Sequence, residues 1–201
     1  MSSYVAENLG ASQSVYLQDI VGLGCGAAIP TLRAGHGFLA ANPEAKIAMI
    51  AVEACSVAFY MDNDPGVLIS LCLFGDGASA SIWDGAQQEG YVLQDFQTIH
   101  RPEHREKVRF ENSEGYLKNK LHRSVPALSS QAVLDLWERH PHSTATQSEH
   151  ILSHGGGKAV IEALREKIPN QTFAEAEAVL REHGNLSSPS CLLYTSDAAD
   201  D

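Results

Sequence analysis

The alternation of short apolar runs with helical stretches is the feature that most constrains how this chain can fold. Residues 19–24 form a short apolar run that ends in glycines, and residues 46–52 form a second run that is apolar after its first residue. Between them, apolar residues recur at helical spacing until Asn42-Pro43, which ends the predicted helix. A strand, a helix and a strand in this order predict a right-handed parallel unit, and therefore an α/β fold.

The rest of the chain continues this alternation. Residues 66–74 are apolar and helical or buried, the turn Gly75-Asp76-Gly77 follows them, and residues 78–83 predict another strand. Residues 84–110 are polar with a short period, which is typical of antiparallel strands. Four later segments complete the prediction: a short strand over 151–154 and helices over 129–140, 158–168 and 173–183.

Charge and cysteine content narrow the class of protein. A net charge of −11 argues against a partner whose phosphates the protein would neutralise, such as nucleic acid. No apolar run approaches the roughly 18 residues that cross a bilayer, and the N-terminal residues have no signal-peptide pattern. The four cysteines form no CxxC pair, so free thiols are expected. We therefore expect a cytoplasmic protein that binds neither nucleic acid nor membrane.

The C-terminal residues differ in character from the rest. Residues 191–201, CLLYTSDAADD, resemble the translation of a sequencing adapter rather than natural protein. The predicted domain therefore spans residues 1–190, and residues 191–201 are expected to lie outside it.

Cys25 is the first candidate for a catalytic residue. It follows the predicted strand and its glycine turn, and it opens the predicted helix. There the positive end of the helix dipole and free N–H groups favour the thiolate over the thiol. Gly24 and Gly26 allow a substrate carbonyl to come close. Taken alone, Cys25 also fits a small buried core residue.

His154 and Asn185 are candidates for oxyanion donors. His154 ends the predicted strand over 151–154 and precedes three glycines, where it can donate to an oxyanion or accept a proton. Asn185 follows a predicted helix, and its amide can serve as a second, uncharged donor. An exposed loop histidine and a common helix C-cap are the alternative interpretations of the two residues.

Four segments match, in order and spacing, the motifs of one enzyme family. GLGCGAAIPTLR matches the family's nucleophile segment at Cys25, and ILSHGGGKAVIEALREKI matches its histidine segment at His154. VLREHGNLSSPS matches its asparagine segment at Asn185, and LFGDGASASIW matches a signature in which Phe74 is a gatekeeping aromatic. Over residues 17–190 the chain thus resembles the type III polyketide synthases, which are chalcone-synthase-like members of the thiolase superfamily.

The resemblance carries expectations about fold and assembly. It implies an α/β fold, namely an incomplete thiolase-like layered sandwich (α/β/α/β/α) with mixed, mainly parallel sheets. It also implies that most of the N-terminal half and the glycine-rich loop after Ser190 are missing, and that the complete enzyme is a homodimer.

The resemblance further implies a decarboxylative condensation. Cys25 would take an acyl group from an acyl-CoA starter. His154 and Asn185 would bind the thioester carbonyl of malonyl-CoA and stabilise the enolate left by loss of carbon dioxide. The enolate would then attack the acyl-cysteine and extend the chain by two carbons. Coenzyme A thioesters are the substrates, and neither a metal nor a redox cofactor is required.

Other positions are compared with the family's pocket. Glu53 and Cys55 fall at pocket positions, and cysteine at position 55 is typical of some bacterial members, although it also fits a packed small residue. The family's second gatekeeping phenylalanine would fall near Asn119, where no aromatic lies, and Tyr116 is the nearest substitute. Plant-like chalcone formation is therefore not expected. Cys72 is expected in the core.

Three alternatives stay open. The initiating 3-ketoacyl-ACP synthases of fatty-acid synthesis share the fold and a Cys-His-Asn set, but a Gln-Ala-Asn stretch usually follows their histidine, whereas three glycines follow His154. A non-catalytic interaction protein, or an inactive fragment, is the alternative from another class. Metal binding by His140, His142, His150 and His154 is disfavoured because no carboxylate lies at useful spacing, so no metal site is predicted.

Overall fold

The computed structural model describes residues 1–85, 91–93, 95–139 and 151–193. Helices and strands follow one another in this order: α1 (Ser2–Asn8), the 3-10 turn η1 (Gly24–Ala27), α2 (Ala28–Ala41), β1 (Lys46–Glu53), α3 (Cys55–Ala58), α4 (Pro65–Leu73), β2 (Gly77–Asp84), η2 (Pro102–His104), β3 (Val108–Ser113), β4 (Tyr116–Leu121), α5 (Val125–Arg139), α6 (Lys158–Lys167), α7 (Ala174–His183) and η3 (Ser188–Cys191). The predicted helix after Cys25, the predicted strands over 46–52 and 78–83, and the three late helices are confirmed to within a few residues. No helix in these ranges combines the length and apolarity needed to cross a bilayer.

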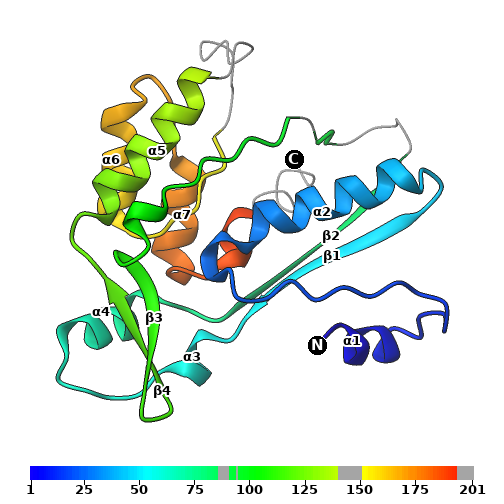
Figure 1. The fold of residues 1–201 in the computed structure, drawn as a ribbon, viewed down its shortest axis with the longest axis horizontal. Coiled ribbons are helices and arrows are strands. Elements are labelled where there is room, and N and C mark those ends of the chain that lie inside the picture. Colours follow the sequence, from blue (N-terminus) through cyan, green and yellow to red (C-terminus); the bar gives the residue numbers. More distant parts are fainter. Residues whose placement is uncertain (86–90, 94, 140–150, 194–201) are drawn as a thin grey trace.

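Helices lie against one face of a long two-stranded ribbon (Figure 1). The ribbon consists of β1 and β2, and α2 runs along it, while α5, α6 and α7 gather near the N-terminal end of α2. Along β1 alternate side chains point to opposite faces, so Met49 is buried whereas Ile50 and Val52 are exposed. One face of the ribbon therefore packs on helices, and the other is open and largely apolar.

Two apolar clusters hold the layers together. The first joins α6 to the start of α7 and its N-cap residue. Its buried members are Ile161, Leu164, Phe173 and Ala176. The second joins α2 and β1 to the residues after η3. Its buried members are Ala28, Leu32, Met49 and Leu192.

The strand pairing differs from the expected mainly parallel sheets. Within the described ranges both ladders are antiparallel, β1 with β2 and β3 with β4. The chain between β1 and β2 folds into α3 and α4 and returns in the opposite direction. The single parallel pairing that the described residues contain is an isolated bridge between Phe74 and Asn185. The α/β class itself is retained, since helices still cover a strand layer.

Two predicted strands are wrong. Residues 19–24 and 151–154 run through the structure without joining any ladder. A strand needs a hydrogen-bonded neighbour, and no described segment pairs with either of them. Both segments still lead directly into the residues whose chemistry was predicted, Cys25 and His154.

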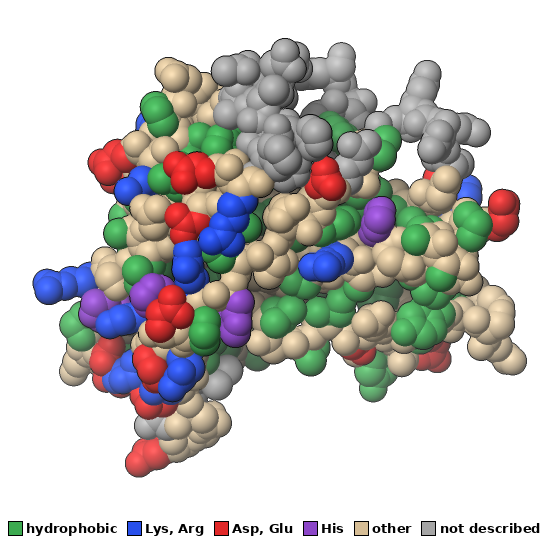
Figure 2. All heavy atoms as spheres, turned by 45° about the horizontal axis from the view of Figure 1, so that its top comes forward, with side chains coloured by type: hydrophobic (Ala, Val, Ile, Leu, Met, Phe, Trp, Pro, Cys, Tyr) green, Lys and Arg blue, Asp and Glu red, His purple; other side chains and the backbone are tan. Residues whose placement is uncertain are grey.

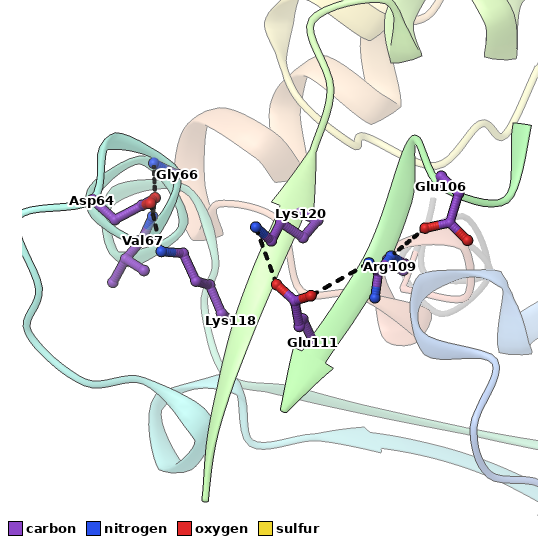
Figure 3. Close-up of polar contacts among 8 residues, drawn as sticks. All are labelled: Asp64, Gly66, Val67, Glu106, Arg109, Glu111, Lys118 and Lys120. Carbon is purple, nitrogen blue, oxygen red and sulfur yellow. Dashed lines mark hydrogen bonds and ion pairs between the residues drawn. The ribbon is translucent and has the colours of Figure 1, made fainter. Parts of the chain in front are cut away.

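An ion pair attaches the β3–β4 hairpin to the start of α4 (Figure 3). The Asp64 carboxylate accepts hydrogen bonds from the backbone N–H groups of Gly66 and Val67, so it caps α4, and it also lies 2.6 Å from Lys118 Nζ on β4. Along the hairpin, Glu111 pairs with Lys120 and with Arg109. Figure 2 shows acidic and basic side chains intermixed on this side of the molecule, so its cations form no uncompensated patch.

The backbone crossing beside Asn185 requires glycine at position 75. A Cβ atom added to Gly75 would lie 2.5 Å from the carbonyl oxygen of His183 and 3.1 Å from Leu186 Cδ2. These partners belong to the segment that carries Asn185, so the two chain segments can approach only without a side chain here.

Gly75→Ala is expected to lower the free energy of unfolding by about 1–3 kcal/mol, because the backbone must shift to relieve this contact. Gly37→Ala is the matched control, since Gly37 lies within α2 with nothing within 4 Å of an added Cβ, and it should leave stability unchanged or slightly raised. Chemical denaturation of both variants measures the difference. Equal stability of the two would contradict the crossing.

Candidate active site

Cys25 lies in the η1 turn (Gly24–Ala27), three residues before α2 begins at Ala28. Its side chain is half-buried, and its sulfur accepts a hydrogen bond from the hydroxyl of Ser187, at an Oγ–Sγ distance of 3.2 Å. These two residues are 162 positions apart in the sequence. Tertiary structure therefore brings the nucleophile segment to the asparagine segment, as the candidate site requires.

The ionisation state of Cys25 differs from the expectation that the helix end favours the thiolate. Burial raises the pKa of the Cys25 thiol, and the Glu53 carboxylate raises it further. The Ser187 hydroxyl acts in the opposite direction, because its hydrogen bond favours the thiolate. Desolvation is the largest of these effects, so the resting residue is a thiol. The expectation from the helix dipole was wrong because it ignored burial.

Asn185 is almost completely buried, with 2% of its surface exposed. It follows α7 and Gly184, and its backbone is bound on both sides: its N–H donates to the carbonyl of Leu73 at 2.8 Å, and its carbonyl accepts from the N–H of Gly75 at 3.0 Å. Its side-chain Nδ2 donates to the carbonyl of Gly156 at 3.3 Å, and its Oδ1 accepts from the N–H of Ser187 at 2.9 Å. Two backbone and two side-chain hydrogen bonds therefore fix the position of Asn185.

His154 is half-buried in the extended segment before α6. Burial lowers the pKa of its imidazole, so the ring is neutral near pH 7. Its Nδ1 is buried and has no hydrogen-bond partner among the described residues. A neutral imidazole with an unoccupied ring nitrogen can donate to an oxyanion or accept a proton.

A chain of contacts connects the three candidate residues. Cys25 is hydrogen-bonded to Ser187, Ser187 is hydrogen-bonded to Asn185, and Asn185 is hydrogen-bonded to Gly156, which lies two residues after His154. The structure thus brings the three segments that carry them together. The assignment of catalytic roles to Cys25, His154 and Asn185 stays a prediction.

Glu53 and Cys55 lie beside this chain of contacts, at the end of β1 and the start of α3. Glu53 Oε1 accepts a hydrogen bond of 2.8 Å from the hydroxyl of Ser188. Burial, followed by the nearby carboxylate of Glu53, raises the pKa of Cys55 to about 11. Cys55 is therefore a neutral thiol that also interacts electrostatically with Cys25. Their predicted pocket role is untested.

Phe74 lines a cavity. Its backbone forms the parallel bridge to Asn185, and its ring packs against that of Phe59 with centroids 6.0 Å apart. The cavity has a volume of about 530 Å³ and is open to solvent. Its lining residues are Ser56, Phe59, Tyr60, Met61, Leu71, Phe74, Gly75 and Asp76. Cys25, His154 and Asn185 are not among these lining residues, and Phe74 is linked to Asn185 through the backbone bridge.

In the β3–β4 hairpin an aromatic residue lies opposite Asn119, where the family's second gatekeeping phenylalanine was expected. Asn119 donates from Nδ2 to Ser70 Oγ at 3.0 Å, and across the ladder it faces Phe110. Phe110 and Asn119 line a small cavity together with Phe59. Sequence reasoning missed Phe110 because the register of the hairpin was not predicted. The side chain of Tyr116 lies outside the described residues.

Several other predictions can be compared with the structure. Cys72 is exposed on α4, so its expected place in the core is wrong. Leu192, which was expected outside the domain, is a buried member of the second apolar cluster, and Cys191 packs against it. The domain boundary after Ser190 stays a prediction. His140, His142 and His150 lie outside the described residues.

The sequence of the chain is similar to those of bacterial type III polyketide synthases. It is 29% identical to 3,5-dihydroxyphenylacetyl-CoA synthase of Streptomyces toyocaensis, over 96% of this chain and 53% of the relative. It is 26% identical to 1,3,6,8-tetrahydroxynaphthalene synthase of Streptomyces griseus, over 94% of this chain and 52% of the relative. No family model matches the chain. The chain spans about half the length of the curated relatives it matches.

Solved structures agree with this similarity. 1,3,6,8-Tetrahydroxynaphthalene synthase of Streptomyces coelicolor, a bacterial type III polyketide synthase, superposes with a TM-score of 0.86 at 25% identity, over 98% of this chain and 58% of that one. A polyketide synthase of the brown alga Ectocarpus siliculosus has the same TM-score at 22% identity, over 98% and 54% of the two chains. The resemblance to type III polyketide synthases and the thiolase-like α/β fold class are thereby confirmed.

Proposed function

We propose that this chain carries the catalytic centre of a cytoplasmic type III polyketide synthase of bacterial type, an acyltransferase. Cys25 is the nucleophile, and His154 and Asn185 bind the thioester carbonyl of malonyl-CoA. The substrates are malonyl-CoA and an acyl-CoA starter, and the reaction needs no cofactor beyond them. Glu53, Cys55 and Phe74 border the path of the growing chain.

The observation that carries the proposal is the hydrogen-bonded path from Cys25 to Asn185 and on to the backbone beside His154. Condensation needs a nucleophile and two uncharged donors that act on neighbouring atoms of the reacting chains. Asn185 Nδ2 has two protons and uses one on Gly156, so the other is available for an enolate oxygen. Neither donor carries negative charge, which would oppose the enolate.

The protonation states of Cys25 and His154 before substrate binds determine which proton moves in the first step. Cys25 is a thiol and His154 a neutral imidazole, so the imidazole can accept the thiol proton as sulfur attacks the starter thioester. The bond between the acyl carbon and coenzyme A breaks, and the imidazolium returns the proton to the departing thiolate as free coenzyme A. The imidazole is then neutral again and can donate to the malonyl-CoA carbonyl.

Loading of Cys25 tests the donor specificity. The protein expressed from the complete open reading frame is incubated with an acyl-CoA and, separately, with the same acyl group on acyl carrier protein. Peptide mass spectrometry is expected to find the acyl group on Cys25 only with the coenzyme A donor. Loading from the carrier protein alone would instead support an initiating ketoacyl-ACP synthase.

A homodimer is also proposed for the complete enzyme. The open apolar face of the β1–β2 ribbon, with Ile50, Val52 and Ile82 exposed, is consistent with further protein packing on this part of the fold. Sedimentation of the protein from the complete open reading frame as a dimer is expected. A strict monomer over the accessible concentration range would count against it.

A further inference from the structure

Ser187 has a backbone conformation that serine rarely adopts. Its φ is 60° and its ψ is −129°, a combination favoured by glycine. The residue is 5% exposed and precedes the η3 turn. Strain of this kind persists only where the surroundings hold it, and it is concentrated at functional sites.

The conformation directs two donors of Ser187 at two different residues. The hydroxyl points to Cys25 Sγ at 3.2 Å, and the backbone N–H points to Asn185 Oδ1 at 2.9 Å. An N–H donor at this position decides how the amide of Asn185 is oriented. With the amide reversed, Nδ2 would face another donor, so Oδ1 must lie toward Ser187 and Nδ2 toward Gly156.

We propose that Ser187 is a positioning residue that couples the nucleophile to the oxyanion-binding amide. Its hydroxyl stabilises the thiolate of Cys25 as it forms, and its N–H fixes the Asn185 amide with Oδ1 toward Ser187 and Nδ2 toward Gly156. The inference rests on the proposed role of Cys25 and deepens it, because it names the group that compensates for burial of the sulfur.

Other titratable groups interact with the Cys25 sulfur. Among the described residues these are the Glu53 carboxylate at the end of β1, the Cys55 thiol at the start of α3 and the Cys191 thiol in η3. The carboxylate opposes formation of the thiolate, and each neighbouring thiol would oppose it if ionised. Ser187 is the side chain in this set that favours the thiolate.

Alkylation of Cys25 as a function of pH tests the proposal. The protein from the complete open reading frame reacts with iodoacetamide, and peptide mass spectrometry isolates the modification of Cys25 from that of the other cysteines. Ser187→Ala and Ser187→Gly are expected to raise the midpoint of the Cys25 profile by about one pH unit, since a charge-assisted hydrogen bond is lost. Glu53→Gln is expected to lower it.

Two comparisons separate this effect from a structural one. Ser187→Gly relieves the backbone strain and retains the N–H, so it should fold even if Ser187→Ala does not. Ser190→Ala removes another buried hydroxyl of the same segment, which accepts from the Leu186 N–H rather than contacting Cys25, and should leave the midpoint unchanged. A folded Ser187→Gly variant with the parent midpoint would overturn the proposal. Alkylation requires no substrate, so a failure of the proposed reaction would be detected separately, as absent acyl loading.

Discussion

Replacing Cys25 by alanine is expected to abolish chain extension while malonyl-CoA decarboxylation continues. The variant lacks the sulfur that is proposed to hold the acyl group, but His154 and the Asn185 amide, which is hydrogen-bonded to Gly156, are retained. The assay follows release of labelled carbon dioxide from malonyl-CoA alongside product formation from an acyl-CoA starter. It uses the protein from the complete open reading frame, because the chain matches only about half of its relatives.

Cys72→Ala is the matched control for this variant. Cys72 is exposed on α4, so its replacement should leave both activities at the parent level. Chain extension by Cys25→Ala at any substantial fraction of the parent rate would show that another group carries the acyl chain.

Loss of either oxyanion donor is expected to have the second large effect. His154→Ala and Asn185→Ala should each lower the decarboxylation rate by roughly 10²–10³-fold, the range found when one such donor is removed. Asn185→Asp should be worse, because it places a negative charge where the enolate forms. The same labelled carbon dioxide assay measures all three rates.

His183→Ala controls for the removal of an imidazole. His183 is exposed at the end of α7, two residues before Asn185, so its side chain should not affect the rate. Decarboxylation by His154→Ala at the parent rate would show that His154 binds no oxyanion. The Asn185 side chain makes two hydrogen bonds, so its removal can also destabilise the fold. Comparing the free energies of unfolding of the variants separates this effect from loss of the donor.

Local structure was predictable where a single period covers a long stretch. α2, α6 and α7 follow from apolar residues at helical spacing, and β1 follows from an unbroken apolar run. The segments 19–24 and 151–154 have similar apolar character but form no ladder. Their state depends on a neighbouring strand, which a local pattern does not contain.

The candidate site was likewise predictable only where a local motif marks the residue. Cys25, His154 and Asn185 were identified from motifs, because each motif places its residue next to glycine and at the end of an element. Ser187 and Ser188 were part of the quoted asparagine segment but received no role. Their importance lies in contacts with Cys25 and Glu53, which are 162 and 135 positions away.

The sequence by itself determined the resemblance to type III polyketide synthases, the helices and the candidate catalytic residues, since these depend on composition and spacing along the chain. Only the tertiary structure decided that Cys25 rests as a thiol, because burial and the field of Glu53 arise from packing. The antiparallel pairing of β1 with β2, and the contact of Ser187 with the nucleophile, were decided there as well. Each depends on which distant segments meet, and no local pattern specifies that.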